Sequence, residues 1–247
     1  MIEPNLELIA ARLEGLEETI IARLIDRVQF ASNLVIYEKG KSRFIGVEGL
    51  SLFEARLVAQ ETMDSEFGRF AVPEERPFNR NLQPPKRLVS IPENCLRVTD
   101  YDTVNFSADI LAGYLRLVPR ICEAGDDFQH GSSVEMDVYA LHAISRRIHF
   151  GSFYVGEAKY SAHPEEYRKL VAAKDIEGMT RLLTRKEVED RIIERVKGKV
   201  ARLQADVNIA VRRLIDPELV AEFYREIVIP LTKRGEIAYI CERDPSL

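Results

Sequence analysis

Polar and charged side chains interrupt otherwise apolar helical segments in three parts of the sequence. Arg146 and Arg147 lie in LHAISRRIHF, Lys159 lies in VGEAKY, and Thr232 and Glu236 lie in IVIPLTKRGE. A cation buried among apolar side chains is costly unless an anion accompanies it. Several such cations facing one cavity therefore predict a site for a small dicarboxylate.

Motifs for nucleophilic, phosphate-binding and zinc chemistry are missing from the sequence. It contains no Gly-rich phosphate loop, no HExxH, no GxSxG and no cluster with metal-ligand spacing. His142 and His149 lie seven residues apart on one helix face, an arrangement that metal ligands can have, but both fall in an apolar stripe. We therefore predict that both histidines are interior side chains, and we expect neither a metal nor a cofactor.

Composition and charge limit the class of protein. The 247 residues are 46% hydrophobic and 30% charged, which is typical of a globular chain with a sizeable core. The 35 basic and 40 acidic side chains give a net charge of −5, so no general basic field attracts nucleic acid or an anionic membrane. An anionic ligand must therefore be held by a local cluster of Arg and Lys.

The cysteines and the N-terminal segment indicate the compartment. Cys95, Cys122 and Cys241 are far apart and odd in number, which favours reduced, buried thiols over a disulfide framework. Residues 1–18 are acidic and periodic, unlike a signal or transit peptide. No apolar run approaches the length of about 18 residues that a membrane span needs. We therefore expect a cytoplasmic protein without a membrane segment.

Helical periodicity dominates the chain and predicts an all-α fold, a helical bundle with long central helices. An apolar stripe from Ile9 to Leu24 advances by steps of three and four residues and predicts a first helix that continues to about Tyr37. Ser51-x-x-Glu54 is a capping box that begins a second helix, which continues to about Phe70. The next segment, 71–98, contains five prolines and is expected to form a long loop.

The second half of the sequence contains the longest predicted helices. Ser132-x-x-Glu135 is a second capping box, and periodicity predicts a central helix over 131–160. A further helix is expected over about 103–123, with a kink at Pro119. Short helices are expected after Pro164 and over 175–183. A long helix should begin at the capping box Thr184-x-x-Glu187 and continue to about Leu214, and the last helix should begin at Asp216-Pro217.

Several stretches resemble the all-helical chorismate mutases of the eukaryotic, long-chain type. They are LEGLEETIIARLIDRVQFA (13–31), SRRIHFGSFYVGEAKY (145–160), KDIEGMTRLLTRKEVEDRIIERV (174–196) and EFYREIVIPLTKRGEIAYI (222–240). The resemblance implies one domain over 1–247 that isomerises chorismate to prephenate in phenylalanine and tyrosine biosynthesis. This [3,3] rearrangement uses no cofactor and no covalent intermediate. It requires cations for two carboxylates and a donor at the ether oxygen of the breaking bond.

The resemblance also implies a role for each candidate catalytic residue. Arg147 matches the arginine that pairs with a substrate carboxylate, and Lys159 matches the lysine that contacts the ether oxygen and a carboxylate. Glu189 matches the glutamate that accepts from the substrate hydroxyl. Thr232 and Glu236 match a pair on the last helix, four residues apart and so on one face. Glu236 donates to the ether oxygen only when protonated, so activity is expected to decline with rising pH.

This sequence departs from the family pattern at three positions. The arginine of the family's first helix is Ala10 here, and Arg12, although near, lies about 200° round a regular helix. The family's asparagine in the helix after the lysine is Arg185, which we hypothesise supplies the missing charge. Arg146, Arg185 and Arg12 are the further candidate substrate-binding residues. The family's arginine and lysine are eleven residues apart, whereas here they are twelve apart, which predicts a single-residue π-bulge in SFYVG (152–156).

Regulated family members bind aromatic amino acids at a dimer interface. Arg69 and the pair Gly131-Ser132 match parts of that effector site, although Ser132 is also interpreted as a helix cap and Arg69 as a surface charge. Tyrosine, phenylalanine and tryptophan are therefore the candidate effectors. The apolar surplus of the long helices favours a homodimer.

Two alternative functions remain open at this point. The altered site is also compatible with a related pericyclic elimination on isochorismate. Ala10 and the twelve-residue spacing are compatible with a helical interaction protein that has lost catalysis. Product analysis and the binding of a bicyclic transition-state analogue distinguish the three.

Overall fold

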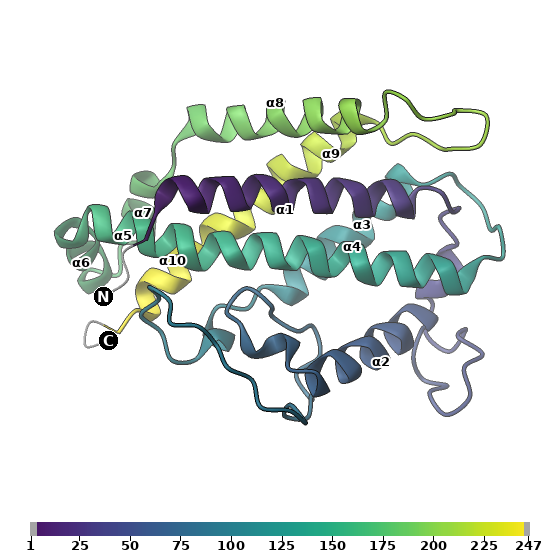
Figure 1. Cartoon of the computed structure of the whole chain (residues 1–247), viewed down its shortest axis with the longest axis horizontal. Coiled ribbons are helices and arrows are strands. Elements are labelled where there is room, and N and C mark those ends of the chain that lie inside the picture. Colours follow the sequence, from purple (N-terminus) through teal and green to yellow (C-terminus); the bar gives the residue numbers. More distant parts are fainter. Residues whose placement is uncertain (1–3, 245–247) are drawn as a thin grey trace.

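Long helices lie side by side in the computed structural model, which describes residues 4–244. α1 and α4 run together through the middle of the molecule, with α8 along the far side of α1 and α2 along the far side of α4 (Figure 1). The helices are α1 (Leu6–Arg27), α2 (Leu52–Glu66), α3 (Ser107–Ile121), α4 (His130–Phe150), α5 (Gly156–Ala162), α6 (Pro164–Ala172), α7 (Ile176–Leu183), α8 (Lys186–Leu203), α9 (Pro217–Phe223) and α10 (Ile229–Glu242). No strand occurs within 4–244, and the predicted all-α class is confirmed.

The contact between α1 and α4 forms the centre of the core. Ile20 and Leu24 of α1 and Ile144 of α4 are fully buried, and each such side chain contributes about 1.5–3 kcal/mol by leaving water. The Arg27 guanidinium is also fully buried and pairs with the Asp137 carboxylate of α4. An ion pair of this kind fixes the register of the two helices, because breaking it leaves an uncompensated buried charge.

The predicted π-bulge is confirmed. Residues Gly151–Val155 form a π-helical turn that joins α4 to α5 without a break, so the central helix extends through Ala162. This turn packs closely against α10: a Cβ at Gly151 would lie 2.6 Å from Cγ2 of Thr232, and a Cβ at Gly235 would lie 1.9 Å from Oγ of Ser152. Glycine is therefore required on both sides of this contact.

Local start signals are confirmed where a single residue acts on the first turn. Ser51 and Glu54 form the expected reciprocal capping box of α2, and Pro164 begins α6. Asp216 caps α9, and its side chain accepts from the backbone N–H of Glu218.

The capping boxes predicted at Ser132 and Thr184 are wrong. α4 begins two residues earlier than Ser132, because Asp126 and Asp127 accept the backbone N–H groups of Phe128 and Gln129 and turn the chain into the helix there. Thr184 instead donates to a carbonyl of the preceding helix α7, and α8 begins at Lys186 with no side-chain cap.

Three predicted helices end earlier than expected. α1 ends at Arg27, whose guanidinium binds the carbonyls of Ala31 and Ser32 and draws the chain away from the helix axis. α8 ends at Leu203 and not near Leu214, because the Gln204 amide bonds both backbone groups of Ile215 and closes a loop. α2 ends at Glu66, shortly before Gly68 in the left-handed region (φ 83°).

The proline-rich segment forms the predicted loop, with no helix between Ala71 and Tyr101. Its anchor is Arg76, 4% exposed, which donates to the carbonyls of Pro73, Phe70 and Val72. This loop covers a cavity of about 540 Å³ beside the end of α2.

The interior positions predicted for His142 and His149 are confirmed. Cys95 and Cys122 are buried as expected. The prediction is wrong for Cys241, which is exposed near the end of α10.

Within the described part of the chain, no helix is long and apolar enough to cross a membrane. The same residues contain no group of three or more metal-ligating side chains.

Candidate active site

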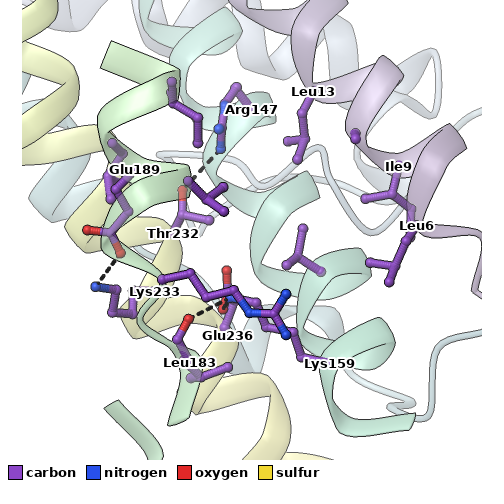
Figure 2. A pocket seen from close by; sticks show the side chains of 16 residues that line it. Leu6, Ile9, Leu13, Arg147, Lys159, Leu183, Glu189, Thr232, Lys233 and Glu236 are labelled. Carbon is purple, nitrogen blue, oxygen red and sulfur yellow. Dashed lines mark hydrogen bonds and ion pairs between the residues drawn. The ribbon is translucent and has the colours of Figure 1, made fainter. Parts of the chain in front are cut away.

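A cavity of about 250 Å³ lies between α1, the central helix, α8 and α10 (Figure 2). The wall from α1 is apolar, and the opposite side carries all the polar side chains together with apolar residues such as Ile192 and Ile229. The apolar wall consists of Leu6, Ile9, Ala10 and Leu13, and the polar residues are Arg147, Lys159, Arg185, Glu189, Thr232, Lys233 and Glu236. All five predicted catalytic residues therefore face one cavity.

Arg147 occupies the inner end of the polar wall. It is 3% exposed and donates from Nη1 to Oγ1 of Thr232 over 3.3 Å. The Thr232 hydroxyl in turn donates to the Val228 carbonyl over 2.7 Å. Within 4–244, Nε of Arg147 has no hydrogen-bond partner and its guanidinium has no carboxylate partner. A buried, unneutralised guanidinium is a binding group for a carboxylate.

Lys159 and Glu236 form the centre of the polar wall. The Lys159 ammonium lies 2.8 Å from Oε2 of Glu236 and also donates to the Leu183 carbonyl over 3.0 Å. Glu236 is 5% exposed, and this burial raises the pKa of its carboxyl above the ordinary value, while Lys159 opposes the shift. A carboxyl with a raised pKa beside an ammonium supplies two donors at one point of the cavity.

Glu189 of α8 and Lys233 of α10 form a second ion pair across the polar wall, 2.7 Å apart (Figure 2). Lys233 was not among the predicted site residues. It adjoins Thr232 and lies three residues before Glu236, a spacing that returns to one helix face and marks it as a site residue.

No model of a known protein family matches the chain. It is similar to the chorismate mutase of Schizosaccharomyces pombe, with 35% identity over 246 residues that cover 97% of this chain and 96% of the relative. The chorismate mutase of Saccharomyces cerevisiae is 34% identical over 97% of this chain and 95% of the relative. The chain belongs to the chorismate mutase family.

Solved structures of this family have the same fold. Chorismate mutase from Candida albicans, in complex with L-Trp, superposes with a TM-score of 0.88 at 34% identity over 97% of this chain and 91% of that chain. For the chorismate mutase AtCM1 with phenylalanine bound in its allosteric site, the TM-score is 0.86 at 33% identity, over 97% of this chain and 96% of that one.

The remaining candidate arginines of this chorismate mutase-family chain separate into two groups. Arg185 lines the cavity, as does Ala10 on the opposite wall. Arg12 and Arg146 do not, and their expected place in the site is corrected. Both face the proline-rich loop, where Arg12 and Arg146 each lie 3.8 Å from Glu74. The Glu74 carboxylate comes from a loop whose path sequence periodicity does not predict.

The three candidate effector residues do not meet within one chain. Arg69 binds Asp64 (2.6 Å) and lies 3.1 Å from Nδ1 of His142. Gly131 and Ser132 are exposed in the first turn of α4, and Ser132 precedes His142 by ten residues, about 15 Å along the helix. Arg69 and the pair Gly131-Ser132 therefore do not form one site within this chain.

Proposed function

We propose that this chain is an isomerase that converts chorismate to prephenate by a [3,3] rearrangement, in phenylalanine and tyrosine biosynthesis, with 1–247 as one catalytic domain. The observation that carries the proposal is the Lys159–Glu236 pair beside the unneutralised Arg147, opposite an apolar wall. Such a cavity matches a small anion with an apolar ring and an ether oxygen. Among residues 4–244, its lining includes no Ser, Cys or His.

Binding in this site selects the reactive shape of the substrate. Arg147 holds one carboxylate with a charge-assisted hydrogen bond, and Thr232 fixes the direction of the guanidinium from 3.3 Å. The substrate ring packs on Leu13 and Ile9 of the apolar wall. Holding both ends of a flexible molecule in a chair-like conformer removes much of the entropy cost of a unimolecular rearrangement.

Lys159 and Glu236 stabilise the ether oxygen as its bond to carbon breaks and negative charge develops there. Two donors at one oxygen contribute about 3 kcal/mol each, against an acceleration that needs about 8 kcal/mol. Glu236 donates only in its protonated form, which burial favours. Glu189 accepts from the substrate hydroxyl, and Lys233, 2.7 Å away, fixes the direction of that carboxylate.

The test is a chorismate-consumption assay with EDTA present and product identification, run on wild type and Lys159→Ala. We expect prephenate, and a loss of at least about a hundredfold in the variant, the effect of one preorganised donor. Lys169→Ala, which removes an exposed lysine of α6, is the matched control and should retain activity. An elimination product would favour the isochorismate reaction instead. No turnover, together with no thermal stabilisation by a bicyclic transition-state analogue, would favour an interaction protein.

We further propose a homodimer that binds an aromatic amino acid between Arg69 of one chain and Gly131-Ser132 of the other. The separation of these residues within one chain and the exposed apolar residues Met63 and Phe67 near the end of α2 support this arrangement. Light scattering should give twice the 28.2 kDa of one chain. Tyrosine, phenylalanine or tryptophan should change the activity of wild type but not of Arg69→Ala.

We propose a cytoplasmic location for the protein. Three free cysteines without disulfides support a reducing compartment. One maize relative is named as a chloroplastic chorismate mutase, so cell fractionation that detects the protein in an organelle would overturn this proposal.

A further inference from the structure

The charged side chains that line the candidate active site do not balance. Two of the four cations are paired inside the cavity, since Lys159 binds Glu236 and Lys233 binds Glu189. Within residues 4–244, the other two have no carboxylate within ion-pair distance. They are Arg147 and Arg185. The cavity therefore presents two guanidinium groups without a carboxylate partner, and their charge of +2 would be neutralised by a dianion.

The two arginines lie at different depths and on different elements. Arg147 is 3% exposed at the end of α4, whereas Arg185 is exposed in the connection between α7 and α8. Arg185 directly precedes α8, and its side chain makes no capping hydrogen bond there. Two residues earlier, the Leu183 carbonyl accepts from Lys159, which attaches this connection to the central helix. Arg185 is thus held at the solvent-facing rim of the cavity.

We propose that Arg185 binds the second carboxylate of the substrate at the rim, while Arg147 binds the first at the inner end. This assignment rests on the proposed function, because it takes the ligand to be a compact dicarboxylate. It also gives the ligand one orientation, with its apolar part against α1, where Ala10 offers neither charge nor hydrogen bond. An arginine binds a carboxylate through two parallel hydrogen bonds, so Arg185 selects diacids over monoacids.

The exposed position of Arg185 limits the size of its effect. A charge-assisted hydrogen bond at a solvated rim corresponds to about a tenfold change in affinity, smaller than that of the buried Arg147. Since both ground state and transition state retain the carboxylate, loss of Arg185 should raise KM and leave kcat largely unchanged. An exposed cation at the rim also attracts anions from solution, so the KM difference should shrink as salt screens it.

The decisive experiment measures the affinity of three probes by calorimetry. The probes are a bicyclic dicarboxylate transition-state analogue and the two monocarboxylates that each lack one of its carboxyl groups. Arg185→Ala should weaken the diacid about tenfold and leave unchanged the monoacid that lacks the rim carboxylate. Arg185→Lys, which keeps the charge, should recover part of the loss. Lys186→Ala removes the same charge from the adjacent position, which does not line the cavity, and should change affinity less than twofold.

Equal affinity of wild type and Arg185→Ala for the diacid would overturn the proposal, and so would equal weakening of all three probes. Circular dichroism checks that each variant is folded. Failure of the proposed function is a separate outcome: wild type would then form no prephenate, although the dependence of diacid binding on Arg185 would still be measurable. If wild type forms prephenate and Arg185→Ala keeps its KM, only the rim assignment fails.

Discussion

Deleting one residue of the π-helical turn Gly151–Val155 tests how the catalytic cations are aligned. Arg147 and Lys159 are twelve residues apart, which in a regular helix of about 100° per residue would leave them about 120° out of line. The extra residue of the π turn removes about 100° of this, so they face one cavity. Without Tyr154, an eleven-residue spacing in a regular helix gives the same alignment, about 20° apart.

Tyr154 is the residue to delete because it is only half-buried. Its removal eliminates a stacking contact with Phe150, whose ring centroid lies 4.6 Å from that of Tyr154. Such a contact stabilises the fold by about 0.5–1.5 kcal/mol. We expect the deletion variant to remain helical and to keep kcat/KM for chorismate within about tenfold of wild type, since the geometry of Lys159 and Glu236 is preserved. The assay follows chorismate loss, with helix content and thermal midpoint recorded in parallel.

The matched control inserts one alanine between Tyr154 and Val155. It rotates Lys159 by about 100° and advances it by about 1.5 Å, which breaks its bonds of 2.8 Å to Glu236 and 3.0 Å to the Leu183 carbonyl. Activity should fall by about 10²–10³, the effect of losing one preorganised donor. The reasoning is refuted by a folded deletion variant as inactive as the insertion variant, or by an insertion variant that keeps its activity.

Two further predictions follow from buried titratable groups. Because burial raises the pKa of Glu236 and the reaction needs its proton, kcat should decline with rising pH, by up to about tenfold per unit above that pKa. Glu236→Gln keeps a donor at every pH, so its kcat should be flat from pH 5 to 8, and the same slope in both proteins would contradict this role. Burial also lowers the pKa of His149 from 6.5 to about 3, so between these values the unfolded chain binds a proton that the folded chain does not. Stability should therefore fall as pH drops below about 6.5, by about 3 kcal/mol at pH 4.5, and urea unfolding of His149→Gln should lack this part of the loss.

Local signals in the sequence predicted that the elements are helices and where several of them begin. Pro164 and Asp216 act on the first turn that follows them, so their effect needs no tertiary context. The π turn was predictable for a related reason. Two side chains expected to share one site, spaced twelve apart on one helix, can meet only if one residue is taken out of the α-helical count.

Helix ends were poorly predicted because polar side chains near them bind the backbone of the loops that follow. The periodic pattern continues beyond Leu203, yet Gln204 bonds Ile215 and ends α8. In the same way, Arg27 ends α1 with hydrogen bonds to carbonyls of the following segment. Each of these polar side chains binds the backbone of the segment after its helix, four to eleven residues away, and helical periodicity does not predict such a contact.

The prediction of the candidate site residues also succeeded for some residues and failed for others. Thr232 and Glu236 were found because polar residues four apart interrupt an apolar helix, a local signal. Arg146 was assigned to the site because it interrupts an apolar helical segment, and Arg12 because it lies near Ala10, where the family has an arginine. The structure places both against Glu74 of the proline-rich loop. Charge marks a residue as a candidate, but only its partner decides whether it is free to bind a ligand.

The ion pair Lys159–Glu236 shows that a partner also influences the protonation state that catalysis needs. The ammonium of Lys159 lies 2.8 Å from the Glu236 carboxylate and favours its ionised form, which cannot donate to an ether oxygen. Burial acts in the opposite direction. A dianionic substrate brings negative charge beside Glu236 and offers Lys159 another partner, and both changes raise the pKa of the carboxyl further. Substrate binding and proton uptake are therefore coupled at this residue. The decline of kcat, which reports the complex, should consequently begin at higher pH than the decline of kcat/KM, which reports the free enzyme.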